Sequence, residues 1–147
     1  MRIVQFFVFF YTFNITSQIE NFSVKNTGVN MTVAILNVDN SIIPGDTIVA
    51  LYIKNENHEK LINPTQSPEN FNCGGLTVWN GKKLAVAVWG NDYSTNDKDG
   101  FYSNEEIHWY LVRNNIYKAL NMDYRVGNLY WEANGIHIIE EAKIDGG

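Results

Sequence analysis

The sequence predicts an all-β protein, and three observations support this prediction. Apolar and polar residues alternate with a period of two in most segments, as they do in strands that bury one face. Few windows keep the apolar period of an amphipathic helix without a strand pattern fitting them better. Aromatic residues make up 14% of the 147 residues and charged residues only 18%. That balance suits a β-rich extracellular domain and excludes a disordered chain.

About eight segments are expected to form strands. This number favours an antiparallel β-sandwich with an Ig-like or jelly-roll-like architecture. In chain order the expected strands are Met31–Asp39, Asp46–Asn55, Cys73–Asn80, Lys82–Asn91, Glu105–Asn114, Ile116–Arg125, Gly127–Ala133 and Gly135–Ile144.

Turn residues separate these segments. Pro44 and Gly45 suit the central positions of a type II turn, so the first two strands are expected to form a hairpin. Asn80-Gly81 is the strongest two-residue hairpin signal in the chain and is expected to join the next two strands. Residues 55–72 contain two prolines and many amides, which predicts a long surface loop.

Alternation within the strands predicts the core. Ile107, Trp109 and Leu111 share one face of their strand and are expected to pack against Val86 and Val88. The chain has a single cysteine, Cys73, so an internal disulfide is excluded and the core alone must hold the domain. Cys73 itself is expected to be a small buried residue.

The first 17 residues have the three parts of a secretory signal peptide. Arg2 supplies a positive charge, an uncharged apolar block follows from Ile3 to Phe13, and small residues precede Gln18. Cleavage near Ser17 would leave one domain, residues 18–147, that is secreted or attached to the cell surface. A buried N-terminal strand is the alternative. The apolar block is too short to cross a bilayer as a helix, so no transmembrane segment is expected.

An acidic loop between two strands is the main candidate for chemistry. Asp92, Asp97 and Asp99 could bind calcium, with Glu105 completing a shell of oxygen ligands. The spacing does not fit an EF-hand, and a solvated turn is the alternative. A glycosidase pair of carboxylates is a third reading, but exposed loop aspartates lack the burial that raises the pKa of an acid.

Aromatic side chains are the better signal for a binding function. Trp79 and Trp89 lie next to turns and are expected at the rim of a surface, where they could stack on sugar rings. His108 and Tyr110 lie on the strand face opposite Trp109 and could form an exposed aromatic strip. Packing in the core is the alternative for each of them. The net charge of −5 and the absence of a basic stripe argue against nucleic acid as a partner.

The order of motifs resembles a β-sandwich module that occurs in large secreted and surface proteins of bacteria with type IX secretion. The segments that carry the resemblance are "PGDTIVALY", "NCGGLTVWNGKKLAVAVWGNDYSTNDKDGF", "NEEIHWYLVR" and "YWEANGIHIIEE". Asn91 departs from the Asp of that pattern and Asn104 from its Gly. The resemblance implies export, a sandwich fold and membership of a larger multidomain protein more firmly than it implies an activity.

Three hypotheses on function follow. The first is a non-catalytic extracellular binding or adhesion module, with polysaccharide or a cell-surface glycan as candidate ligand and calcium as candidate stabilising ion. The second is a structural spacer module of a larger surface protein. The third is a small secreted glycoside hydrolase. Exposure of Trp79, Trp89 and Tyr110 would favour the first hypothesis over the second.

Overall fold

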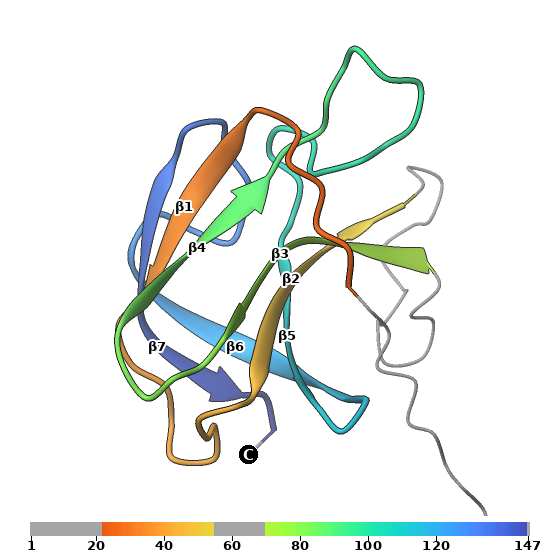
Figure 1. Cartoon of the computed structure of the whole chain (residues 1–147). Coiled ribbons are helices and arrows are strands. Elements are labelled where there is room, and N and C mark those ends of the chain that lie inside the picture. The colour runs from red at the N-terminus through yellow and green to blue at the C-terminus, as the bar shows by residue number, and fades with distance from the viewer. Residues whose placement is uncertain (1–21, 55–69, 147) are drawn as a thin grey trace, which may run out of the picture.

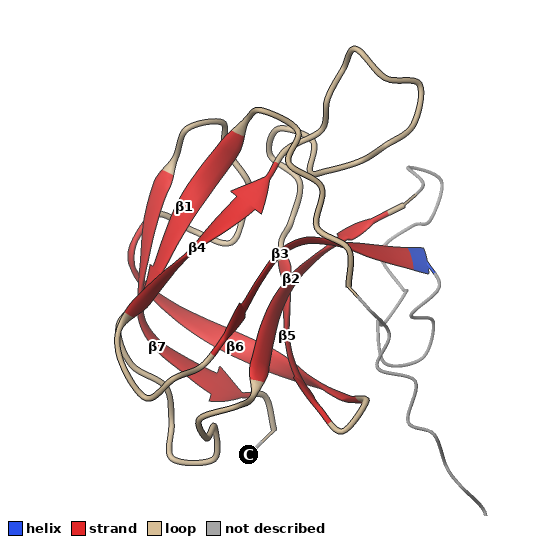
Figure 2. Ribbon diagram, in the orientation of Figure 1, coloured by secondary structure: helices blue, strands red, loops and turns tan. Residues whose placement is uncertain are grey.

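A computed structural model of the chain describes residues 22–54 and 70–146 (Figure 1). The expected signal peptide, residues 1–17, lies outside the described residues, and so does most of the expected loop 55–72. The described residues form an all-β fold without an α-helix, as predicted (Figure 2). The strands are β1 (Asn30–Ile35), β2 (Thr47–Ile53), β3 (Phe71–Val78), β4 (Leu84–Trp89), β5 (His108–Arg113), β6 (Ile116–Val126) and β7 (Ile136–Ile144).

A single sheet contains these seven strands in the order β3-β2-β5-β6-β7-β1-β4. Neighbouring strands run antiparallel except β1 and β7, which run parallel. The first half of the long strand β6 pairs with β5 and its second half with β7. The sheet therefore bends into two layers that share β6, with β1, β4 and β7 facing β2, β3 and β5 (Figure 1).

Two glycines let the sheet nearly close into a barrel. The edge strands β3 and β4 approach each other, although no hydrogen-bonded ladder joins them in the described ranges. A Cβ atom at Gly75 would lie 2.7 Å from the carbonyl oxygen of Ala87, and one at Gly74 would lie 2.5 Å from the ring of Phe101. Because real Cβ atoms do not approach so closely, only glycine allows this closure.

The main core lies between the two layers and confirms the predicted burial. Val86, Val88, Ile107, Trp109 and Leu111 are all buried in one cluster. A second cluster covers the other face of β2, β3 and β5. Its buried members are Val49, Leu51, Phe71, Cys73 and Tyr110. Both faces of this layer are therefore apolar. In a layer with one solvent-exposed face, that face would carry polar residues.

Cys73 is a buried residue of the second cluster, as expected. Its Sγ atom donates a hydrogen bond to the carbonyl oxygen of Gly75 at 3.1 Å. Burial raises the pKa of the thiol to about 11, so the thiol stays protonated at neutral pH.

The two expected hairpins are wrong. β1 pairs with β4 and β7, whereas β2 pairs with β3 and β5, so the connections β1–β2 and β3–β4 are arches that cross between the layers. The local turn at Pro44-Gly45 is nevertheless as predicted. The N–H of Asp46 donates to the carbonyl oxygen of Ile43 at 3.1 Å, and Gly45 has a φ of 101°. A turn reverses the chain, but it does not decide which strand becomes the hydrogen-bonded neighbour.

Another turn does form a hairpin that was not predicted. Asn114 and Asn115 join β5 to β6 and have φ values of 51° and 60°. Positive φ at both central positions matches a type I′ turn, which asparagine tolerates better than most residues.

The strand expected at Gly127–Ala133 is absent from the structure. In this segment only Tyr130 forms a β-bridge, with Glu106. The side chain of Asn128 accepts a hydrogen bond from the N–H of Tyr130 at 2.8 Å and makes a local turn. The indole of Trp131 is buried and donates to the carbonyl oxygen of Val88 at 2.9 Å. Trp131 thus packs into the core from this segment, and the segment does not add a strand to the sheet.

Candidate functional site

The acidic loop leaves β4 at Gly90 and returns at Phe101. Backbone hydrogen bonds close its base, from the N–H of Asn91 to the carbonyl oxygen of Phe101 at 2.8 Å and from the N–H of Phe101 to that of Trp89 at 3.1 Å. The side chain of Asn91 accepts a further hydrogen bond from the N–H of Asp99 at 2.9 Å. The loop is therefore held in one conformation by its own chain.

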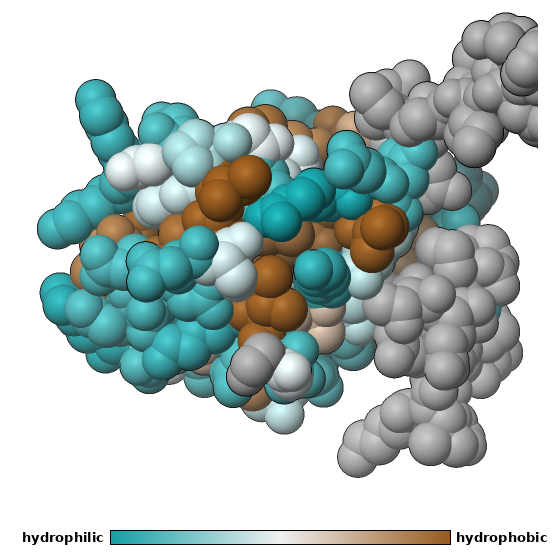
Figure 3. Space-filling view, turned by 90° about the horizontal axis from the view of Figure 1, so that it is seen from below, coloured by the Kyte–Doolittle hydropathy of each residue, from teal (hydrophilic) through white to brown (hydrophobic). Residues whose placement is uncertain are grey.

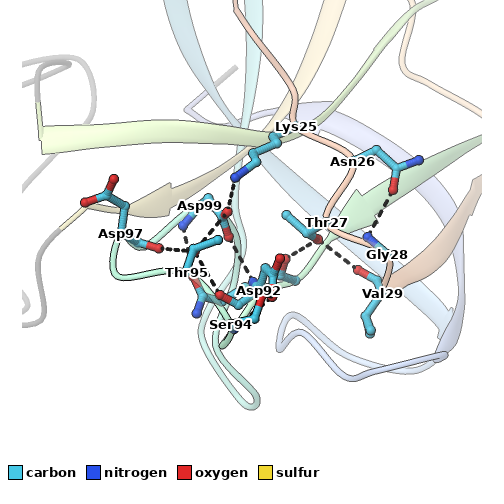
Figure 4. A network of polar contacts seen from close by, with 12 residues as sticks. Lys25, Asn26, Thr27, Gly28, Val29, Asp92, Ser94, Thr95, Asp97 and Asp99 are labelled. Carbon is cyan, nitrogen blue, oxygen red and sulfur yellow. Dashed lines mark hydrogen bonds and ion pairs between the residues drawn. The ribbon is translucent and has the colours of Figure 1, made fainter.

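Asp92 and Asp99 organise the interior of the loop (Figure 4). Asp92 accepts hydrogen bonds from the N–H and the hydroxyl of Ser94, at 2.9 and 2.6 Å. These bonds lower the pKa of Asp92. Asp99 accepts from the N–H of Asp92 at 2.9 Å and from the hydroxyl of Thr95 at 3.3 Å.

The segment before β1 supplies a counter-ion for this loop. The ammonium of Lys25 donates to Oδ2 of Asp99, and the hydroxyl of Thr27 donates to the carbonyl oxygen of Gly90 (Figure 4). Burial is the largest single influence on Asp99 and opposes its ionisation. The hydrogen bond and charge of Lys25, together with the hydrogen bonds from Asp92 and Thr95, outweigh it, so the pKa of Asp99 is lowered. The repulsion between the loop carboxylates is thus relieved by a lysine of the same chain.

Glu105 belongs to a different group of contacts. Its Oε1 accepts from the ammonium of Lys98 at 2.7 Å and from the N–H of Ile53 at 3.2 Å, and its Oε2 accepts from the N–H of Tyr102 at 2.8 Å. Lys98 also donates to the carbonyl oxygen of Ile53 at 2.7 Å. Glu105 therefore ties the end of β2 to the segment that enters β5.

The four residues expected to bind calcium are thus divided. Asp92 and Asp99 lie together, Glu105 is paired with Lys98, and Asp97 is exposed. Among the described residues, no group of three or more His, Cys, Asp or Glu side chains is arranged to hold a metal ion. Calcium binding at this loop stays a prediction, and it would require Lys25 to release Asp99.

The residues expected to form an aromatic surface are mostly buried. Trp79 is only 5% exposed and Tyr110 only 7%, so their expected exposure is wrong. Trp79, which follows β3, packs in the main core, and Tyr110 packs in the second cluster on the opposite face of β5 from Trp109. Trp89 is half-buried. His108 is half-buried against Phe71, with ring centroids 5.4 Å apart, and burial lowers its pKa.

A different aromatic pair is exposed at the acidic loop. The ring of Tyr93 is 74% exposed and is stacked on Tyr102, with centroids 5.9 Å apart and planes inclined by 21°. The ammonium of Lys98 lies 4.4 Å from the centroid of the Tyr102 ring. Neither tyrosine is among the residues predicted to bind a ligand. Tyr93 lies between Asp92 and Ser94 and has no apolar neighbour in sequence. This polar context could have predicted that its ring is exposed.

Four aspartates of the described chain are poor candidates for a general acid. Where the pKa of a described carboxyl departs from its ordinary value, it is lowered, at Asp39, Asp46, Asp92 and Asp99. A glycosidase acid needs a raised pKa, so these four residues fit structural roles better.

No protein family, curated protein or solved structure matches this chain. The likeness to modules of type IX secretion therefore stays an expectation based on the residues alone. In the part of the chain that is described, no helix is long and apolar enough to cross a bilayer.

Proposed function

We propose that this chain is an exported, non-catalytic binding module whose ligand is a polysaccharide or a cell-surface glycan. The observation that supports this function is the exposed ring of Tyr93, stacked on Tyr102. An exposed aromatic face beside hydroxyl and carboxylate groups suits a sugar ring, which has apolar C–H faces and a polar edge. Ser94, Asn96 and Asp97 are exposed next to Tyr93 and could accept or donate hydrogen bonds to such an edge.

The support beneath Tyr93 favours a built surface. Tyr102 is half-buried, its N–H is bonded to Glu105, and Lys98 lies over its ring. Lys98 is in turn bonded to Glu105 and to the carbonyl oxygen of Ile53. Because Tyr102 is held in this way, the Tyr93 ring stacked on it loses little conformational freedom when a ligand binds. This preorganisation improves affinity.

Binding to a panel of immobilised neutral and acidic polysaccharides tests the proposal. Tyr93→Ala should weaken binding about tenfold, which corresponds to one lost stacking contact. Tyr130→Ala is the matched control, because Tyr130 is also an exposed tyrosine but lies on another loop. If no polysaccharide binds, or if both variants bind as the wild type does, the proposal is wrong. Export is tested separately by mass spectrometry of the secreted protein, which should begin near Gln18.

A structural spacer is the second candidate. It is favoured by the burial of Trp79 and Tyr110, which leaves two of the predicted contact residues without an exposed face. A spacer would bind no glycan, while its removal from a longer protein would change the reach of neighbouring domains. The polysaccharide panel therefore separates the two candidates.

A further inference from the structure

The two arches meet at the end of the molecule opposite the acidic loop (Figure 1). The N–H of Gly45 donates to the carbonyl oxygen of Trp79, and the N–H of Trp79 donates to that of Asp46, both at 2.8 Å. These bonds hold the arches side by side. Figure 3 views this end, where hydrophobic residues are exposed between hydrophilic ones; Ile43 and Val78 are among the exposed apolar residues of these segments.

A hollow of about 410 Å³ lies between the exit of β1 and the β3–β4 arch, and we call it the arch hollow. Pockets that hold small ligands have volumes of roughly 300–1,000 Å³, so one sugar ring would fit. Leu36 and Val38, both half-buried, form its apolar wall together with Trp79, which is almost fully buried. Lys82 and Lys83 line its open side and are exposed.

Five cations of the described chain are paired with carboxylates, whereas these two lysines and Lys118 are not. Lys25, Lys98, Lys143, Arg113 and Arg125 each form an ion pair with a carboxylate. Lys82 and Lys83 have no ion-pair partner among the described residues. Two adjacent unpaired ammonium groups at the mouth of a hollow attract anions, even though the chain carries a net charge of −5.

We propose that the arch hollow binds an anionic sugar residue of an acidic polysaccharide. The C–H face of the ring would lie against Leu36 and Val38, and its carboxylate or sulfate would face Lys82 and Lys83. An exposed lysine pair alone would select only charge, and an apolar wall alone would select only shape. Together they favour a ring that carries a negative group at its edge. This site is separate from Tyr93, so one module would contact a chain at two ends and gain from the linked contacts.

The test measures binding of the wild-type protein to three oligosaccharides, an oligogalacturonate, a sulfated heparin fragment and a neutral glucan. In the double variant Lys82→Gln/Lys83→Gln, affinity for the anionic ligands should fall about fivefold, as expected for the loss of two exposed charges. Lys118→Gln/Lys143→Gln makes the same change in net charge on other strands and should have less than about a twofold effect. Raising the salt concentration should weaken binding of the wild type but leave any binding of the glucan unchanged.

Amide chemical shifts locate the site independently of affinity. On titration with the better anionic ligand, the largest shifts should fall at Leu36–Val38 and Trp79–Lys83. Preference for the uronate or for the sulfate would support the proposal and identify the anion. Equal losses in the two double variants, or shifts confined to other strands, would overturn it. Retention of these shifts in Tyr93→Ala would support the arch hollow, even if that variant shows that the proposal for Tyr93 is wrong.

Discussion

Arg113 binds Asp46 through two hydrogen bonds, from Nε to Oδ1 at 2.6 Å and from Nη2 to Oδ2 at 2.5 Å. The same Nη2 donates to the carbonyl oxygen of Ser41 at 2.8 Å, and Oδ2 of Asp46 also accepts from the N–H of Ile43 at 2.9 Å. Asp46 is only 3% exposed. The pair therefore fastens the β1–β2 arch to the end of β5. In this position the arch lies beside the β3–β4 connection.

Loss of this arginine should destabilise the domain. In Arg113→Met the buried carboxylate of Asp46 loses its counter-ion, and we expect unfolding to become easier by about 2–3 kcal/mol. The value is below that of a fully buried pair because the Arg113 side chain is 33% exposed. Arg125→Met is the matched control, since Arg125 pairs with Glu140 at the surface and should cost less than about 1 kcal/mol. Equal costs in urea melts would contradict a structural role for Asp46.

Stability should fall in acid, and Asp46 should be one of the causes. The hydrogen bond from Arg113 lowers the folded-state pKa of Asp46 despite its burial. In the unfolded chain the pKa of an aspartate is about 3.9. The stabilisation is therefore complete above the unfolded pKa and is lost as the pH falls through the folded pKa. Urea melts between pH 2 and 6 should show a smaller acid-induced loss in Asp46→Asn. An identical slope in both proteins would show that the pair does not carry the pH dependence.

Burial of one ring and exposure of the other predict opposite outcomes for two aromatic substitutions, at Trp109 and at Tyr93. Trp109 is buried in the main core and its indole donates to the hydroxyl of Tyr124 at 3.0 Å. Trp109→Ala should cost on the order of 3–5 kcal/mol. Tyr93→Ala should change stability by less than about 0.5 kcal/mol, because its ring is largely in solvent. A small loss for Trp109→Ala in denaturant melts would mean that the strand register is shifted by one residue.

Calcium and Lys25 should compete for the acidic loop. We expect millimolar calcium to raise the melting temperature, and Lys25→Met to enlarge the rise, because the ammonium no longer occupies Asp99. At a hundredfold excess over Kd the stabilisation would be about 2.7 kcal/mol. Asp99→Asn should weaken the effect, and magnesium should produce a smaller one. Melting curves that calcium leaves unchanged in both the wild type and Lys25→Met would show that the loop is a polar turn.

Several features of the fold follow from neighbouring residues alone. Period-two alternation identified the face of β5 that carries Trp109 and the opposite face that carries Tyr110. Pro44-Gly45 predicted a turn with positive φ, and Cys73 was expected to be buried. The eighth expected strand, Gly127–Ala133, is not formed. An irregular segment can show the same alternation of apolar and polar residues, and this one holds Trp131 in the core.

The candidate sites were only partly within reach of such patterns. The aspartates of the acidic loop are neighbours in sequence, and Asp92 and Asp99 do lie together. Their counter-ion is Lys25, which is 74 residues from Asp99 and has no local pattern that announces the pairing. The arch hollow likewise joins Leu36 to Lys83 through two connections that look like hairpins in the sequence.

By itself, the sequence determined that the protein is all-β, where most strands lie and which residues share a strand face. These properties depend on backbone preferences and on alternation, which act over a few residues. Only the tertiary structure decided which strands pair, that Trp79 and Tyr110 are covered, and that Lys82 and Lys83 border a hollow. Each of these depends on what a distant segment places against the residue. Alternation can show that two side chains face the same way, but it carries no information about what lies opposite them.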